Sequence, residues 1–556
     1  MGLGVATVLA GAAGQGTFAM AASPSASPPG TAIRVEARDF SFEPGSLDAD
    51  PGTSVSIELL NVGAQPHNIA FRFAGEAEGE VPDAVGAIVA PAGSDLLTFD
   101  VPSPGTYQFV CDVHPLDMTG TLVVRGADTS AAPVRPTAVP GTEPPPEPLA
   151  LGADPRIDPS KFVVTEFASG LPYPAGMAEL PDGSLLASTN AFTGGGFIES
   201  RGKLLRIVDE DGDGRADSID PVGIVRRVAR ARVPVYVDLP GAVVQMRRAA
   251  GLLVLSSRQA NRTQIVVLRE PLVPGDAFTW LGVVQLEFPE GHLHDTYAIA
   301  LRPGPTDGST EVYFNVGSGL DSEVDPTRIE ASGLIDAALM TGSVYRMTLI
   351  DDGESIGVTD LRLVATGLRN AAAMAFHPDS GDLYIQDNGM DSEDDPDEPV
   401  NADELNVIAV DRLGIEVPDF GHPDQYVAYR TGERVGTTGE MPVVAFQPID
   451  GSEAQGAAEF TFAPPGFPAP FDEGIFIGFH GTYQEGGLAN GENPVLWVDP
   501  DMSSMLEFIP NGAPQVGHPD SLLATQDSLY VADLQPSGPL TERSPEGVIY
   551  RISPRR

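Results

Sequence analysis

A pair of short apolar segments recurs six times along residues 152–556 of the chain. The first segments are 183–188, 251–256, 311–316, 381–386, 473–478 and 527–532. The second segments are 202–207, 263–268, 342–347, 404–409, 494–499 and 547–552. Short runs rich in branched and aromatic residues, bounded by Gly and Asp, are typical of β-strands. A unit of roughly 70 residues that repeats in this way predicts a six-bladed β-propeller, with these segments as inner and outer strands.

The segment 162–167, Phe-Val-Val-Thr-Glu-Phe, precedes the first unit, and we expect it to pair with the C-terminal blade. An array of two-sheet sandwiches is the alternative, but matched pairs of strands favour radial repetition. A chain of 556 residues also exceeds what a single hydrophobic core usually supports. We therefore expect a second domain before the propeller, in an all-β protein.

The N-terminal part contains a dense set of soft metal ligands. Cys111, the only cysteine, lies three residues before His114 and seven before Met118, and His67 lies upstream. Thiolate, imidazole and thioether together suit copper, as in a trigonal site of two His and one Cys with a distant Met. Alternating segments at 54–59 and 106–110 indicate strands around these residues. A buried structural cysteine beside incidental polar residues is the alternative.

Residues 32–125 resemble the cupredoxin family, in which a His is followed by Cys, His and Met on one loop before the last strand. The resemblance implies a Greek-key β-sandwich that holds a type 1 copper. By carry-over the ligands would be His67, Cys111, His114 and Met118.

The remaining N-terminal segments indicate export. Residues 1–22 form a short apolar run with a small-x-small pattern, which is typical of an export signal, and 23–31 form a flexible leader. Residues 126–151 are Pro-rich and predict a linker. A formal charge of −46 argues against nucleic acid and anionic membrane surfaces as partners. We expect a periplasmic, cell-surface or extracellular protein without an integral membrane domain.

An acidic loop at 209–220 has the spacing of an EF-hand calcium loop, with acids at positions 1, 3, 5, 9 and 12 and Gly at 6. Its flanks indicate strands, so we expect a calcium-stapled hairpin; a solvated acidic turn is the alternative. A second acidic run, 387–395, is interpreted as a solvated loop. The expected calcium ligands are Asp209, Asp211, Asp213, the carbonyl of Arg215, Asp217 and Asp220.

Residues 160–556 resemble the soluble glucose/sorbosone dehydrogenase family, six-bladed propellers that use pyrroloquinoline quinone (PQQ). The resemblance rests on motifs at 291–303, 367–370, 376–378, 403–406, 419–423 and 479–483. It implies that His294 is the catalytic base and that Arg369 and Asn370 bind the cofactor. Tyr297 stands where relatives often carry a basic residue, and Lys203 is the only clearly placed lysine of the propeller.

Together these features predict an exported sugar or alcohol dehydrogenase that passes electrons from PQQ to its own copper domain, and then to a copper protein or cytochrome. Two alternatives stay open. One is a non-catalytic copper-binding or ligand-binding propeller protein. The other is a lactonase-like propeller hydrolase with an accessory cupredoxin domain.

Overall fold

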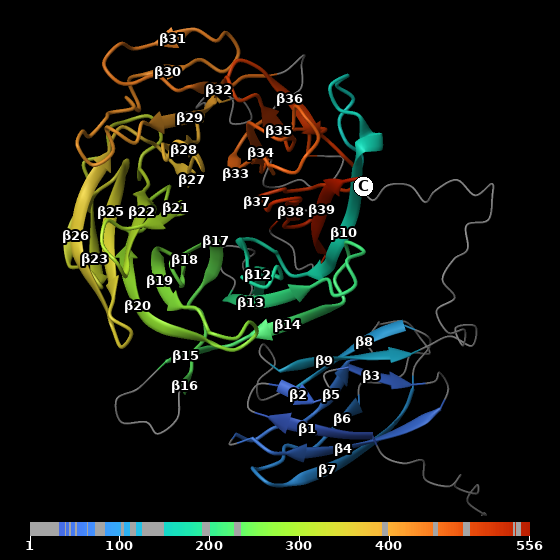
Figure 1. Ribbon diagram of the computed structural model, residues 1–556. Coiled ribbons are helices and arrows are strands. Elements are labelled where there is room, and N and C mark those ends of the chain that lie inside the picture. The colour runs from blue at the N-terminus through green and yellow to red at the C-terminus, as the bar shows by residue number, and fades with distance from the viewer. Residues whose placement is uncertain are drawn as a thin grey trace, which may run out of the picture. The chain divides into compact units, whose positions relative to one another are not determined.

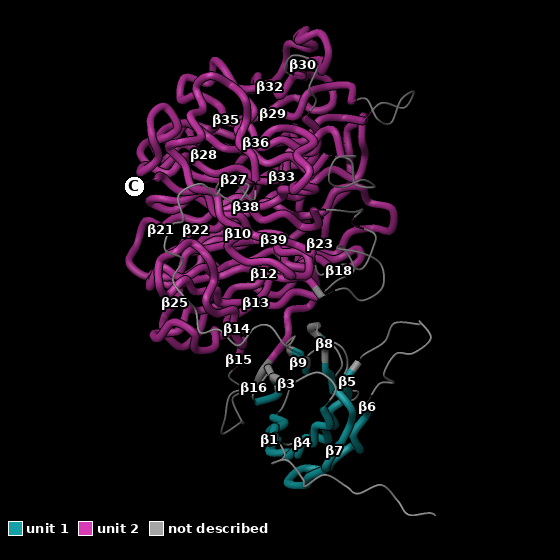
Figure 2. The backbone as a smooth tube through the Cα atoms, turned by 90° about the vertical axis from the view of Figure 1, so that its right-hand side faces the viewer, with its two compact units in different colours: residues 1–143 teal, residues 144–556 magenta. Residues whose placement is uncertain are grey.

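The computed structural model divides into two compact units, residues 1–143 and 144–556 (Figure 2). It describes residues 33–38, 41–43, 46–49, 53–63, 65–72, 84–101, 105–111, 118–124, 149–191, 201–226, 235–391, 399–448, 454–481, 490–536, 540 and 546–555. The expected export signal, leader and most of the linker lie outside these ranges. Apart from a single 3₁₀ turn, Pro159–Lys161, the described residues form strands and loops, which confirms the all-β fold class. In the described ranges no helix has the length and apolar character needed to cross a membrane.

Unit 1 is a sandwich of two sheets. One sheet has the strand order β2 (Ser41–Glu43), β1 (Ile33–Arg38), β4 (Ser54–Asn61), β7 (Ser94–Asp100). The other has the order β3 (Ser46–Ala49), β9 (Thr119–Val124), β8 (Gly105–Val110), β5 (Ala70–Arg72), β6 (Ala84–Val85). Alternation along the strands directs Ile57 and Leu59 of one sheet, and Phe71, Phe109 and Leu122 of the other, into a single apolar core.

Unit 2 contains six sheets of four or more strands within its described residues, which we call blades A to F in chain order. Blade A is β11 (Met177–Glu179), β12 (Leu185–Ala191), β13 (Arg201–Val208) and β14 (Ser218–Val222). Blade B is β17 (Ala242–Ala249), β18 (Leu252–Gln259), β19 (Arg262–Arg269) and β20 (Phe278–Glu287), extended by β15 (Ile224–Arg226), β16 (Val235–Tyr236), β23 (Arg328–Gly333) and β24 (Ala337–Met340).

The other four blades have four strands each. Blade C is β21 (Ile299–Pro303), β22 (Ser309–Val316), β25 (Ser343–Asp351) and β26 (Ile356–Ala365). Blade D is β27 (Ala371–Phe376), β28 (Leu383–Asp387), β29 (Asp403–Ile408) and β32 (Val444–Phe446). Blade E is β33 (Ala457–Phe462), β34 (Ile475–Phe479), β35 (Val495–Val498) and β36 (Met505–Ile509). Blade F is β37 (Ser521–Ala524), β38 (Leu529–Asp533), β39 (Gly547–Pro554) and β10 (Phe162–Leu171). A separate hairpin of β30 (Tyr426–Val427) and β31 (Arg434–Val435) lies in the chain between β29 and β32 of blade D.

The first strands of the blades contact one another in the cyclic order β11, β17, β21, β27, β33, β37 and back to β11. The six sheets accordingly surround a common centre (Figure 1). This is the arrangement of a six-bladed β-propeller, with apolar side chains packed between neighbouring blades.

The predicted strand pairs are real, but their positions within the blades were wrong. The first segments form the second strands, β12, β18, β22, β28, β34 and β38, and the second segments form the third strands, β13, β19, β25, β29, β35 and β39. Middle strands are covered on both faces and read as continuous apolar runs, so they dominate the pattern. β10 pairs antiparallel with β39, as predicted for the segment 162–167.

Polar side chains bridge the centre of the ring. The Arg247 guanidinium on β17 donates to the Glu459 carboxylate on β33 at 2.6 Å, and these strands occupy opposite positions in the cycle. Gln245, also on β17, donates to the Ala372 carbonyl of blade D at 2.7 Å and accepts from the Ile299 amide of blade C at 3.1 Å. Side chains from blade B therefore contact the neighbouring blade C and reach across the lumen to blades D and E.

Candidate functional site

Three of the four predicted copper ligands lie together in unit 1. Cys111 directly follows β8, Met118 directly precedes β9, and the Cys111 amide donates to the Met118 carbonyl at 2.9 Å. His67 forms an isolated bridge with Val89, and all three ligand side chains are fully buried. His114 lies outside the described residues.

The separation of two of these side chains, His67 and Cys111, fits a shared metal ion. His67 Nδ1 and Cys111 Sγ are 3.7 Å apart. If metal bonds to nitrogen and sulfur are about 2.0 and 2.3 Å long, as they are for zinc, a trigonal angle separates the two donor atoms by about 3.7 Å. The Asn61 side chain donates to the Gln65 and Val89 carbonyls at 2.7 and 2.8 Å, which fixes the turn that carries His67.

The acidic loop at 209–217 connects β13 to β14, which pair antiparallel, so the predicted hairpin is present. One carboxylate oxygen from each of Asp209, Asp211 and Asp217 lies within 4.8 Å of the others. The Asp213 carboxylate instead accepts from the Arg215 amide at 2.8 Å, and Asp220 is exposed on β14. The structure thus brings together three of the predicted acids and leaves these two outside the group.

The predicted propeller residues share one end of the ring. The start of each first strand pairs with the end of the second strand, as Ile299 does with Phe314, Ala371 with Asp387 and Ser521 with Ala532. Loops that precede first strands therefore lie at the same end as loops that follow second strands. These loops carry His294, Arg369, Asn370, His480 and His518. We call this the site end.

A repeated hydrogen-bond arrangement holds the site-end loops. Near the end of β22, Asn315 Oδ1 accepts from the amides of Tyr297 and Ala298, both at 2.9 Å. At the end of β28, Asp387 accepts from the amides of Arg369 and Asn370 at 2.9 and 2.7 Å. At the end of β38, Asp533 accepts from the amides of Gly517 and His518 at 2.7 and 2.9 Å. In three blades, the second strand thus anchors the loop that leads into the first strand.

His294 lies in the loop before β21, where its backbone amide donates to the Ser318 carbonyl at 3.1 Å. Its Nε2 atom is buried and has no hydrogen-bond partner within the described part of the chain. Burial, together with the nearby positive charge of Arg369, lowers the pKa of His294 to about 2. The imidazole is therefore neutral, with a buried polar atom available to a ligand.

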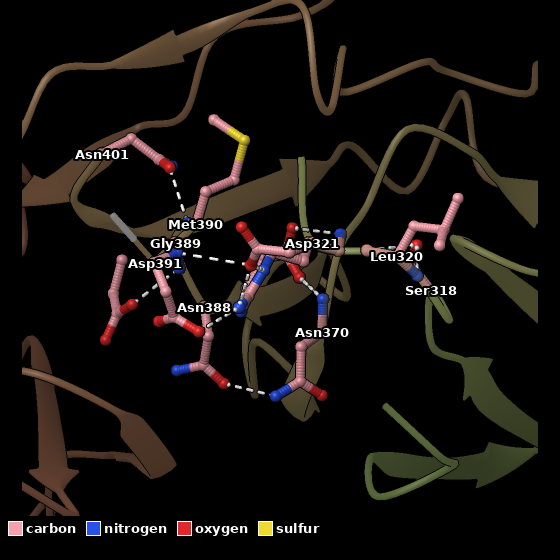
Figure 3. A network of polar contacts seen from close by, with 12 residues as sticks. Ser318, Leu320, Asp321, Asn370, Asn388, Gly389, Met390, Asp391 and Asn401 are labelled. Carbon is pink, nitrogen blue, oxygen red and sulfur yellow. Dashed lines mark hydrogen bonds and ion pairs between the residues drawn. The ribbon is translucent and has the colours of Figure 1, made fainter. Parts of the chain in front are cut away.

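Arg369 is the centre of a polar network at the site end. Figure 3 shows Asp321, Asn370, Asn388 and Asp391 of this network. Its guanidinium donates to Asp321 Oδ1 at 2.8 and 2.5 Å and to Asp391 Oδ2 at 3.0 Å. The Asn370 side-chain amide donates to Asn388 Oδ1 at 2.9 Å, and Asn370 Oδ1 is a buried atom without a partner in the described ranges. The guanidinium charge is already compensated by two carboxylates.

The interpretation of the acidic run 387–395 as a solvated loop was wrong for Asp387, whereas the Asp391 side chain is 73% exposed. Asp387 is buried, and burial raises the pKa of its carboxyl to about 7 despite the amides of Arg369 and Asn370. Asp391 pairs with Arg369. These acids are fixed by backbone amides and an arginine that come from the preceding loop, which the local sequence does not reveal.

Further site-end residues went unrecognised in the sequence. The Arg258 guanidinium, at the end of β18, forms an ion pair with buried Asp295 and lies 5.4 Å from the centre of the Tyr297 ring. A cavity of about 10 Å³, roughly the size that holds one water, is lined by Arg369, Asp387, Glu404 and His422, among others. Burial raises the pKa of Glu404 to about 8.

A second imidazole at the site end has a carboxylate partner. His480 follows β34, and its Nδ1 lies 2.7 and 2.8 Å from the two carboxylate oxygens of Asp520. The His518 ring lies 4.9 Å from the His480 ring, and His518 Nδ1 is 3.0 Å from the His480 carbonyl. Burial alone lowers the pKa of His480, but the Asp520 carboxylate outweighs it, so the pKa is raised.

Comparisons with known proteins found one family model and several solved structures that are similar to parts of this chain. Residues 11–124 match the family model described as a cupredoxin-like domain. Comparison with curated proteins gave no match.

Among solved structures, the PQQ-bound aldose sugar dehydrogenase of Streptomyces coelicolor is 16% identical, with a TM-score of 0.42, over 71% of this chain and 99% of its own. The apo-form of the soluble aldose sugar dehydrogenase of Escherichia coli is 16% identical, with a TM-score of 0.42, over 71% and 100%. Auracyanin A, a blue copper protein of Chloroflexus aurantiacus, is 21% identical, with a TM-score of 0.16, over 17% and 98%. The N-terminal part of the chain is thus a cupredoxin-like domain.

Proposed function

We propose that the protein is an exported oxidoreductase that oxidises a sugar or alcohol with PQQ at the site end of the propeller and passes the electrons to a type 1 copper in unit 1. This proposal is carried by the presence of two features on one chain. Unit 1 contains a buried cluster of His67, Cys111 and Met118. The site end of the propeller carries buried polar atoms that have no partner in the described ranges.

The residues at the site end fit the polar face of a quinone cofactor. His294 Nε2 and Asn370 Oδ1 are buried, lack a partner among the described residues and belong to loops at the same end of the ring. A buried polar atom without a partner is costly, so these atoms favour a bound polar group. His294, Arg369 and Asn370 would hold the cofactor, and PQQ would supply a two-electron oxidant. To contact an anionic cofactor, Arg369 must share its guanidinium with Asp321 and Asp391.

Copper fits the donor set of unit 1. A thiolate, an imidazole and a thioether, all fully buried, form a soft and dry environment that favours copper over harder ions. In this proposal His114 completes the site. A two-electron reduced quinone must deliver electrons singly to the next carrier, and a copper domain on the same chain is present at high effective concentration when the linker at 126–151 permits an encounter.

Calcium is a further part of the proposal. Asp209, Asp211 and Asp217 offer three hard oxygen ligands, and the Arg215 carbonyl would add another. The loop joins the outer strands of blade A and pairs with blade F, because Arg551 contacts Asp209 Oδ2 at 2.8 Å. A bound ion would therefore stabilise the junction of these two blades.

The test uses the full-length protein loaded with Cu²⁺ and PQQ without oxygen. A thiolate-to-copper charge-transfer band in the visible should appear on loading and should bleach when glucose is added. Without PQQ the band should persist, and the Cys111→Ser variant should show no band while still reducing an artificial dye. A copper band that never responds to sugars or alcohols in the presence of PQQ would contradict the proposed electron path. Failure of the protein to bind PQQ would favour the ligand-binding alternative.

A further inference from the structure

Two buried carboxyl groups lie side by side next to the loop at 367–370, which we call the cofactor loop. Asp387, the last residue of β28, and Glu404, on β29, are directly opposite in the antiparallel register. Side chains of directly opposite residues point to the same face of a sheet, with Cβ atoms roughly 4.5–5.5 Å apart. Both side chains are buried and line the same cavity of about 10 Å³. The two carboxyl groups are therefore close neighbours in a space for about one water.

The two carboxyl groups have different hydrogen-bond partners. Asp387 accepts the backbone amides of Arg369 and Asn370 at 2.9 and 2.7 Å. Hydrogen bonds of this kind favour the ionised form of a carboxyl group. Glu404 accepts the Val427 amide at 3.4 Å, which is a long and weak contact. When the pair carries a single proton, that proton therefore belongs to Glu404.

The surroundings do not neutralise two negative charges. Among the described residues neither carboxyl group forms an ion pair, and the Arg369 guanidinium, which lines the cavity, is bound by two other carboxylates. The charged and titratable groups around the pair are Arg369 with its partners Asp321 and Asp391, and Asp403, His422 and Tyr426. Burial lowers the pKa of His422 to about 4, so this imidazole is neutral above that pH. Buried carboxylates in such an arrangement repel each other, and a shared proton removes the repulsion.

Burial, together with the negative charge of Asp387, raises the pKa of Glu404 to about 8. We propose that Glu404 is a positioning residue of the site: its proton lets ionised Asp387 anchor the cofactor loop, and loss of this proton to solvent at alkaline pH frees the loop and weakens cofactor binding. In the deprotonated pair, repulsion moves Asp387 away from the amides of 369–370. The link to cofactor binding rests on the proposed function, whereas the proton on Glu404 does not.

The first test is amide hydrogen exchange of the full chain without cofactor. Protection at 369–370 should fall as pH rises through about 8. The amides of 297–298 are the internal control, because the side chain of their acceptor, Asn315, does not titrate. Glu404→Gln keeps a neutral side chain of the same size at every pH, so its protection at 369–370 should stay constant. Asp379→Asn replaces an exposed acid in the turn between β27 and β28 and should behave like wild type.

The second test is the affinity of the full-length protein for PQQ as a function of pH. In wild type the Kd should rise about tenfold for each pH unit above the transition, since binding then requires the uptake of one proton. Glu404→Gln should keep the affinity that it has at low pH, and Asp379→Asn should follow wild type. An identical pH dependence of the Kd in wild type and Glu404→Gln would overturn the inference.

A third measurement distinguishes a proton from a metal cation. Addition of millimolar Ca²⁺ should leave the wild-type exchange profile at 369–370 unchanged. A profile that becomes independent of pH in Ca²⁺ would mean that a cation neutralises the two carboxylates, and it would overturn the inference.

The outcomes separate this inference from the proposed function. If protection at 369–370 falls near pH 8 in wild type but not in Glu404→Gln, and PQQ binds at no pH, the proposed function fails and the proton on Glu404 stands. If wild-type protection at 369–370 follows that at 297–298 across this range, the inference fails whatever the activity. This last comparison uses wild type alone, so it decides the matter even when Glu404→Gln does not fold.

Discussion

The ion pair between Arg247 and Glu459 offers the sharpest test of the propeller's interior. It joins opposite blades through the lumen, with Glu459 only 2% and Arg247 22% exposed at the side chain. Replacing Arg247 with Met keeps most of the side-chain bulk but leaves a buried carboxylate without its cation. Breaking a buried pair in this way typically costs about 3–5 kcal/mol.

The loss in free energy of unfolding should depend on pH, because Glu459 becomes neutral when it takes up a proton. Burial already raises the pKa of Glu459 in the presence of Arg247. Relative to an unfolded value of about 4.3, protonation costs about 1 kcal/mol at pH 5 and about 5 kcal/mol at pH 8, at roughly 1.36 kcal/mol per unit. A raised folded pKa gives stability that is present below the unfolded pKa and is lost as pH rises. Arg247→Met should therefore be mildly destabilising at pH 5 and severely so at pH 8.

Urea unfolding at the two pH values, followed by tryptophan fluorescence, measures this effect in unit 2 alone. Both tryptophans of the chain, Trp280 and Trp497, lie in that unit. The double variant Arg247→Met/Glu459→Met removes both charges and should lose the dependence on pH, since well-packed apolar residues often replace a buried pair at little cost. A free-energy loss for Arg247→Met that is equal at both pH values would refute the reasoning.

Three further predictions concern the loops. Removal of calcium by a chelator should lower the melting temperature of the full chain, because an ion bound only by the folded state stabilises it. Asp211→Asn should reduce this change more than Asp213→Asn, since the Asp213 carboxylate lies outside the acidic group. Equal melting temperatures in chelator and in calcium would exclude the site. Asp387→Asn should become more stable relative to wild type as pH rises from 4 to 7 in urea unfolding, because the pKa of Asp387 is raised to about 7 and the fold favours its neutral form; a constant difference would contradict that. Asn315→Ala leaves two loop amides without their acceptor, so it should cost about 1–3 kcal/mol and increase amide hydrogen exchange at 297–298, with unchanged exchange as the contrary result.

Strands that are buried on both faces were visible in the sequence, and short or half-polar ones were not. β22 is buried at all eight positions, and its apolar run predicted a blade. β11 and β37, by contrast, span three and four residues and leave little periodicity to recognise. This is why, in each blade, the first segment was assigned one position too far inward and the second segment one position too far outward.

Ligand types could be predicted from sequence, whereas their partners could not. The order of His67, Cys111, His114 and Met118 depends on local spacing, which a single sequence displays. The partners of Arg369 lie 48 and 22 residues away, and those of Arg247 and His480 lie 212 and 40 residues away. Such pairs form only because the ring brings residues that are distant in the sequence close together, so no local sequence pattern predicts them.

The anchoring of three site-end loops by their own blades has a consequence for engineering. Asn315, Asp387 and Asp533 fix loops through backbone amides, so the contact does not depend on which side chains the loop presents. The exposed positions of these loops can therefore be exchanged, whereas their buried positions cannot. Libraries that randomise 293, 514 and 515 while keeping Asn315 and Asp533 should vary the surface of the site end on an intact scaffold.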